Sequence, residues 1–166
     1  MSIVFRDKFC KSRLRDILIQ SLKDPASTVR ETAAQQVHLL NASFGFEYMK
    51  KWVFEEMKKI YKQSGNYLHR MVPLKAIQLM AQSEGQHKLT CSQIKTQFQD
   101  LLISALKDAI SNVRFTACRV VETVIIQIKL DNDILGSFKE ILSKLQKSDS
   151  DEDVQFFARQ ALEAMQ

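Results

Sequence analysis

The sequence predicts an all-α superhelix, a solenoid of about four two-helix repeats. The first observation is an internal echo, because residues 17–37 and 101–121 align without a gap and share eleven of twenty-one residues. The second is the period: Arg114 stands 84 residues after Arg30, about twice a repeat of roughly 40, which is typical of helical solenoids. The third is that Gly (4) and Pro (2) are scarce, which disfavours an all-β fold with many tight turns.

The marker Val-Arg stands at 29–30 and at 113–114. Two altered copies of this marker complete the pattern. His69-Arg70 follows the first marker by 40 residues, and Val154-Gln155 follows the second by 41. We therefore interpret 1–166 as a single solenoid domain with repeats at roughly 6–42, 46–83, 89–129 and 132–166. Solenoids of this kind usually provide binding surfaces.

The first unit is predicted to be two antiparallel helices. One helix runs to about Lys23 and stops at Asp24-Pro25, because the residue before Pro avoids the α region and Pro is tolerated at a helix start. The second runs from about Ala26 to Leu40. One inward stripe on it follows helical spacing: Val29, Ala33, Val37 and Leu40.

The second unit is predicted to have helices on either side of Ser64-Gly65. The helix over about Phe46–Gln63 carries two apolar stripes, which indicates burial between neighbours. These stripes are Phe46, Met49, Val53, Met57 and Ile60, and separately Tyr48 and Trp52. Asn66 is expected to cap the following helix, and Pro73 to kink that helix or shift its start.

The third and fourth units follow the same plan. Predicted helices cover about Cys91–Lys107, Ser111–Lys129, Asp133–Gln146 and Asp149–Met165. Stacking the four units predicts a short right-handed arc in which the second helix of each unit lines the concave face.

An acid in the turn and a base six residues later recur along the chain. Asp24 precedes Arg30 and Asp108 precedes Arg114, whereas Asp149 precedes Gln155 and Ser64 precedes Arg70. Stacking would place these side chains in a row, so that Asp of one unit pairs with Arg of the next. This structural ladder is the favoured interpretation of Arg30 and Arg114. Arg70 has no acid in its own unit, which favours a contact with a binding partner.

The residues give no indication of catalysis, a metal or a cofactor. The chain has no Gly-rich phosphate loop, no Gly-x-Ser-x-Gly elbow, and no His-Glu-x-x-His spacing among His38, His69 and His87. The three cysteines are odd in number and widely spaced, unlike a disulfide framework or a zinc site. We therefore expect a non-enzymatic chain with no cofactor, no metal and no small-molecule ligand.

Composition also bears on location and on polymeric partners. No apolar run reaches the roughly 18–20 residues needed to span a bilayer, and Met1 to Cys10 has no signal-peptide pattern. We expect a cytoplasmic, or also nuclear, protein that binds neither nucleic acid nor membrane. The net charge of +5 is spread along the chain. A lysine face over residues 50–62 is best explained as solvated, since it lacks the interleaved aromatic residues of a nucleic-acid groove.

The turn motif resembles a HEAT repeat, and three blocks resemble a particular HEAT family. Residues 66–71, 112–115 and 153–158, with Ala161-Leu162, are similar in order and spacing to the last repeats of the scaffold (A) subunit of protein phosphatase 2A. A divergent HEAT-repeat regulatory subunit of protein phosphatase 4 is the alternative within this resemblance. The similarity extends from about Ile17 to the C-terminus.

The resemblance implies a function and a site. In that family the C-terminal repeats hold the phosphatase catalytic subunit through the turns and the starts of the second helices. Carried over to this chain, it implies a non-catalytic scaffold that binds a serine/threonine phosphatase catalytic subunit. The implied contacts are Asn66, Tyr67, His69, Arg70, Asn112, Arg114 and Phe115. Two other interpretations stay open: a HEAT adaptor with an unrelated protein partner, and a truncated remnant of a longer scaffold.

Overall fold

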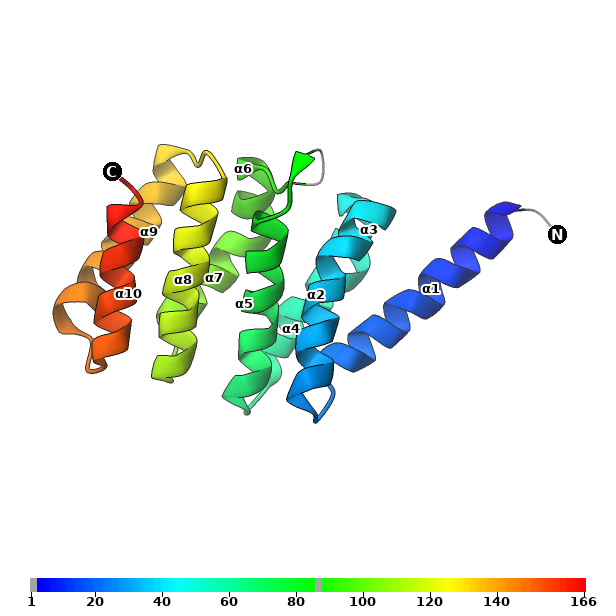
Figure 1. The fold of residues 1–166 in the computed structure, drawn as a ribbon, viewed down its shortest axis with the longest axis horizontal. Helices are drawn as coiled ribbons and strands as arrows, with labels where there is room; N and C mark the ends of the chain where they lie inside the picture. Colours follow the sequence, from blue (N-terminus) through cyan, green and yellow to red (C-terminus); the bar gives the residue numbers. More distant parts are fainter. Residues whose placement is uncertain (1–2, 86–87) are drawn as a thin grey trace.

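A computed structural model describes residues 3–85 and 88–166. Side chains are described for residues 12–85 and 88–166. In this part of the chain the regular structure is helical, without strands, and the helices form four antiparallel pairs (Figure 1). We call the pairs units 1 to 4, and the helices of each pair A and B. Unit 1 comprises α1 (Ile3–Leu22) and α2 (Ser27–Phe44), and unit 4 comprises α9 (Asn132–Ser148) and α10 (Glu152–Glu163).

The A helices of the two middle units are each divided by a π-helical turn. In unit 2 the A helix is α3 (Phe46–Met49), η1 (Lys50–Phe54) and α4 (Glu55–Gln63), and the B helix is α5 (Tyr67–Ala81). In unit 3 the A helix is α6 (Cys91–Gln93), η3 (Ile94–Phe98) and α7 (Gln99–Leu106), and the B helix is α8 (Ser111–Gln127). The two π-turns occupy equivalent places, since each starts 17 residues before its own B helix.

The B helices form one continuous layer. Helices α2, α5, α8 and α10 lie side by side in chain order, with the A helices of units 2 to 4 behind them and α1 running obliquely away beside α2 (Figure 1). Neighbouring B helices contact each other more extensively than neighbouring A helices do. The B layer is therefore the inner side of the stack, as the solenoid interpretation expects. The all-α superhelical repeat predicted from the sequence is confirmed.

Aromatic side chains fill the core where the middle units meet. Phe54 and Phe98 end the two π-turns and are almost completely buried, and their rings meet edge to face with centroids 5.0 Å apart. Phe138 of α9 is fully buried as well. Each buried Phe stabilises the fold by about 1.5–3 kcal/mol through removal of apolar area from water. The extra residue in each π-turn thus places a large ring between stacked units.

One residue of a predicted apolar stripe, Trp52, is exposed. Trp52 lies in η1 with 40% of its surface exposed, and the cations of Arg15 and Lys51 lie 5.0 Å and 4.9 Å from its ring centroid. The expectation that Tyr48 and Trp52 form a second sandwiched face is therefore wrong for Trp52. The π-turn interrupts the helical period on which that prediction depended.

Side-chain caps mark the starts of two B helices, α5 and α10. The side chain of Asn66 accepts a hydrogen bond from the Leu68 N–H at 3.0 Å, so the predicted cap of α5 is confirmed. Pro73 lies inside α5, and the helix continues through it. Asp151 caps α10 by accepting from the N–H groups of Asp153 and Val154.

No helix among the described residues is long and apolar enough to cross a membrane.

Candidate functional site

The A–B turns of all four units have the same internal hydrogen bond. The carboxylates of Asp24, Asp108 and Asp149 each accept from the backbone N–H two residues later, at 2.8, 3.0 and 3.0 Å. In unit 2 the hydroxyl of Ser64 takes this role and accepts from the Asn66 N–H at 3.3 Å. Asp and Ser favour turns because their short side chains reach their own backbone in this way.

Six residues after each of these turn residues, a side chain of the B helix donates a hydrogen bond to the carbonyl of that turn residue. Nη1 of Arg30 donates to the carbonyl of Asp24, and Nη1 of Arg114 to that of Asp108, at 2.7 and 2.9 Å. Arg70 Nη1 donates to the Ser64 carbonyl at 3.2 Å. Gln155 donates to the Asp149 carbonyl at 2.7 Å, which explains why Gln suffices in the last unit. The six-residue spacing in the sequence thus reflects a bond within each unit.

In Arg70 and Arg114, guanidinium nitrogens that do not bind the turn carbonyl join one unit to the next. Nη2 of Arg70 lies 2.9 Å from Oδ1 of Asp108, whose other oxygen accepts from the Tyr61 hydroxyl at 3.0 Å. Arg114 binds Asp149 in a bidentate manner, with Nε and Nη2 each 2.7 Å from a carboxylate oxygen. We call these two pairs the Arg–Asp ladder. Pairing between units is confirmed, but its direction is the reverse of the expected one: Arg of one unit contacts Asp of the following unit.

The ladder groups are largely buried, and their pKa values are shifted. The side chains of Arg114 and Asp149 are only 12% and 5% exposed. Burial opposes the charge of Asp149, but hydrogen bonds from Arg114 and from the backbone outweigh it, so the pKa of that carboxyl is lowered. The hydrogen bond to Asp149 raises the pKa of Arg114. Burial, followed by the bond to Asp108, raises the pKa of Tyr61.

The junction between units 1 and 2 lacks the acid of the ladder. Ser64 stands where Asp108 and Asp149 stand at the later junctions, and no acidic side chain of the described residues pairs with Arg30. Arg30 is nevertheless only 5% exposed. The expectation that Arg70 is the arginine without an acid is therefore wrong, because the acid comes from the following unit and not from its own.

The turns and B-helix starts form a row that we call the turn ridge, residues 24–30, 64–70, 108–114 and 149–155. Of the contacts implied by the resemblance, Asn66 and Asn112 are exposed on this ridge, and Tyr67 and His69 are partly buried. Arg70 and Arg114 are mostly occupied by the ladder. Phe115 follows the ridge and points over the B layer, where its ring stacks on Phe157 at 5.7 Å.

Exposed apolar residues extend the ridge beyond the predicted set. Leu68 is 43% exposed next to Asn66, and Ile110 is 39% exposed next to Asn112. The sequence pattern gave them no special place, because each stands one or two residues from a predicted contact with no motif of its own. Together with Asn66 and Asn112 they give the ridge both apolar and amide groups.

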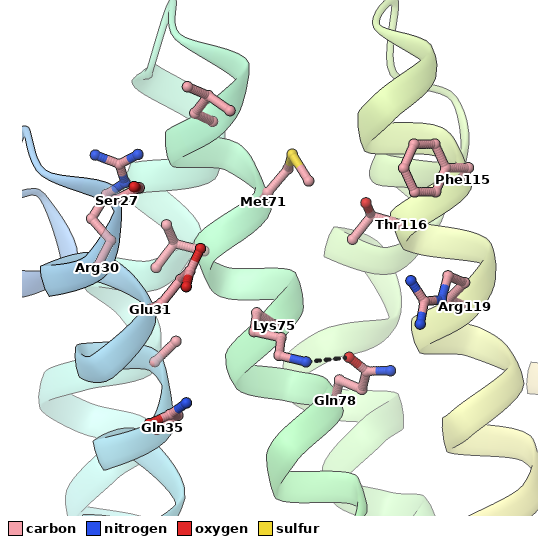
Figure 2. Close-up of a pocket in the computed structure, with 13 residues that line it drawn as sticks. Ser27, Arg30, Glu31, Gln35, Met71, Lys75, Gln78, Phe115, Thr116 and Arg119 are labelled. Carbon is pink, nitrogen blue, oxygen red and sulfur yellow. Dashed lines mark hydrogen bonds between the residues drawn. The ribbon is translucent and has the colours of Figure 1, made fainter.

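A groove of about 420 Å³ crosses the B layer between α2, α5 and α8 (Figure 2). We call it the helix groove. Its floor is apolar, and three cations and one acid line it. The lining includes Arg30, Glu31, Ala34, Leu68, Met71, Val72, Lys75, Phe115 and Arg119. Sequence reasoning missed this groove, because its residues come from three units and none belongs to a local motif.

A second apolar hollow of about 410 Å³ lies on the outer side of unit 1, between α1 and α2. Leu14, Ile17 and Val29 are 45%, 59% and 38% exposed there. Their counterparts 84 residues later, Phe98, Leu101 and Val113, are buried against unit 2. The first unit thus presents a stacking face that has no neighbour among the described residues.

The lysine face of unit 2 is partly neutralised within the structure. Lys58 pairs with Glu55 and Lys59 with Glu56, each at 2.7 Å. Lys51 lies over the ring of Trp52. Such surface pairs contribute little to stability, but they reduce the positive field of this face.

Comparison with known proteins shows the fold. No protein-family model matches the chain, and no curated protein matches it in sequence. A designed armadillo repeat protein in complex with the peptide (KR)4 is similar in structure, with a TM-score of 0.60 and 20% identity over 96% of this chain and 67% of that one. An engineered protein gives a TM-score of 0.58 and 18% identity over 96% and 65% of the two chains. This chain therefore spans about two thirds of each, and it has an armadillo- or HEAT-like helical repeat fold.

Proposed function

We propose that the chain is a non-catalytic scaffold that binds another protein, and that a serine/threonine phosphatase catalytic subunit docks on its turn ridge. The repeat fold fits a binding scaffold, and helical repeat folds of this kind are used mainly as extended binding surfaces. The phosphatase is proposed as the partner because residues 66–71, 112–115 and 153–158 resemble a phosphatase scaffold.

One observation carries the choice of the ridge. The Arg–Asp ladder links the turns of units 2, 3 and 4, so exposed side chains between them are held in fixed relative positions. A surface that is ordered before binding loses little conformational entropy when its partner docks. Asn66, Leu68, Ile110 and Asn112 are exposed on this surface, whereas the ladder arginines are not free to leave it.

The test must separate binding from folding. Replacing Tyr67 and Arg70 would break the pair with Asp108, so loss of binding by that variant would not identify a contact. Ile110→Ser with Asn112→Ala is sharper, because it removes an exposed apolar group and an amide while Ser supplies a good N-cap for α8. We expect this variant to keep its helicity and to bind purified catalytic subunits of phosphatases 2A or 4 more weakly by about 2 kcal/mol.

A matched variant on the other layer provides the control. Lys139→Ser with Lys144→Ala changes two exposed residues of α9 away from the ridge and should retain wild-type affinity. Equal binding by the ridge and control variants would reject the ridge as the docking site. Failure of the wild-type chain to bind either catalytic subunit, in a chain shown to be folded, would reject the phosphatase as partner and favour an adaptor with an unrelated protein.

A further inference from the structure

Arg30 is a buried cation, and only one of its guanidinium nitrogens donates hydrogen bonds to the described residues. Its Nη1 is held by the carbonyl groups of Asp24 and Pro25, at 2.7 and 2.8 Å. Its Nε and Nη2 form no hydrogen bond with the described residues. These are the atoms that bind Asp149 in Arg114, and Nη2 is the atom that binds Asp108 in Arg70. Arg30 thus presents the donor edge of the ladder without its acceptor.

This donor edge adjoins the helix groove. Arg30 lines the groove, and its free nitrogen groups are not among the enclosed atoms that lack a partner. Figure 2 shows the guanidinium group at the turn end of α2, beside the start of α5. These nitrogen groups are accessible from the groove, and a carboxylate can bind a guanidinium group with two parallel charge-assisted hydrogen bonds. An oxyanion that enters from the groove can therefore complete the ladder.

The other charged groups of the groove favour the same kind of ligand. Lys75 and Arg119 are exposed and line the groove from α5 and α8, with Lys75 Nζ held 3.2 Å from the Gln78 side-chain oxygen (Figure 2). Glu31 is the one acidic residue of the lining, against three cations. Between the cations, Met71, Val72 and Phe115 provide an apolar floor. The lining therefore suits an acidic chain that also carries apolar side chains.

We propose that the helix groove binds an extended acidic segment of a partner protein, and that a carboxylate of this segment occupies the place at Arg30 that Asp108 and Asp149 occupy at the later junctions. Crossing from α2 to α8 covers two helix spacings of about 9 Å each. An extended chain covers this distance with about six residues at about 3.3 Å per residue. Successive side chains of such a chain point to opposite sides, so carboxylates at every second position can meet Arg30 and Arg119 while the apolar side chains between them contact the apolar lining.

This inference rests on the proposed protein-binding role but not on the phosphatase. The groove shares Arg30 and Leu68 with the turn ridge, whereas the residues changed in the ridge test lie outside the groove. Asn66, Ile110 and Asn112 do not line the groove. A failure of ridge binding would therefore leave the groove proposal standing, and a failure of groove binding would leave the ridge proposal standing.

The experiment is a fluorescence anisotropy titration of the full chain with a labelled peptide of about eight residues in which Glu and Leu alternate. We expect saturable binding that weakens with added salt, and at least about tenfold weaker binding of a matched Lys and Leu peptide, because the lining is cationic. Ser64→Asp supplies the missing acid from within the chain. We expect it to weaken binding of the acidic peptide about fivefold or more, because its carboxylate competes for Arg30.

Charge controls separate the site from the overall field of the protein. Ser92→Asp adds the same charge at an exposed position of α6 and should change affinity less than about twofold. Lys75→Gln with Arg119→Gln should weaken binding about tenfold or more, whereas Lys139→Gln with Lys144→Gln on α9 should not. Circular dichroism checks that each variant is folded. Equal affinity of Ser64→Asp and Ser92→Asp would overturn the role of Arg30, and absence of acidic-peptide binding by the folded wild type would overturn the proposal.

Discussion

All three junctions between units contain the same kind of turn. The junction between units 1 and 2 differs from the two later ones in how its arginine is paired. At the later junctions the guanidinium groups of Arg70 and Arg114 are shared between their own turn and the acid of the following unit. At the first junction Arg30 holds its own turn, and Ser64 stands at the turn position that an acid occupies in units 3 and 4. The difference separates two roles of the arginine: closing a turn, which all three perform, and joining units, which two perform.

The comparison also explains which substitutions the repeat tolerates. Gln155 stands in place of the arginine in unit 4 and keeps the bond to its own turn carbonyl at 2.7 Å. Ser64 keeps the bond within its turn but has no carboxylate to pair with Arg30. The turn bond is therefore retained in every unit, and the bond between units is the part that varies.

The largest expected effect comes from breaking the most buried ladder pair. Arg114→Ala leaves Asp149 without its bidentate partner, and we expect it to lower the free energy of unfolding by about 3 kcal/mol. Urea denaturation followed by circular dichroism measures this change. Lys144→Ala, an exposed position on α9, is the control and should stay within about 0.5 kcal/mol of wild type. Equal stability of the two variants would mean that the pair does not hold units 3 and 4 together.

The next effect depends on pH. Because the pKa of Asp149 is lowered on folding, its contribution is present above the pKa of an unfolded Asp, about 3.9, and is lost as the pH falls through the folded value. We expect Asp149→Asn to be less stable than wild type by about 2 kcal/mol at pH 7. That gap should narrow as the pH falls below about 4. A gap that stays constant down to pH 2.5 would show that the charge of Asp149 does not stabilise the junction.

A smaller effect is expected at the middle junction. Tyr61→Phe removes the hydroxyl that donates to Asp108 and should cost about 1 kcal/mol of unfolding free energy. Tyr67→Phe is a matched control in the same unit, because no hydrogen bond of its hydroxyl is found among the described residues. Thermal unfolding of both variants tests this, and equal midpoints would contradict a stabilising Tyr61–Asp108 bond.

The smallest effect has the opposite sign. Ser64→Asp should keep the turn bond and give Arg30 the acid it lacks, so we expect a gain of about 1 kcal/mol in unfolding free energy. A loss of stability would show that the first junction cannot adopt the geometry of the other two.

The sequence predicted the fold and the row of turns because both depend on local, repeated signals. Asn66 could be recognised as a cap, and the six-residue spacing of Asp108 and Arg114 marked the turn. The direction of pairing could not be predicted, because this spacing is identical within each unit and carries no information about neighbours. The π-turns ending at Phe54 and Phe98 depend on packing between units, and the helix groove depends on three B helices lying side by side.

The most direct test of the ladder is a double-mutant cycle between Arg30→Ala and Ser64→Asp, measured as free energies of unfolding. The structure predicts that Ser64→Asp stabilises the chain when Arg30 is present and does not when it is absent, with a coupling energy of about 1–2 kcal/mol. A coupling energy of zero would contradict the claim that an acid at the turn position of one unit pairs with the arginine of the preceding unit.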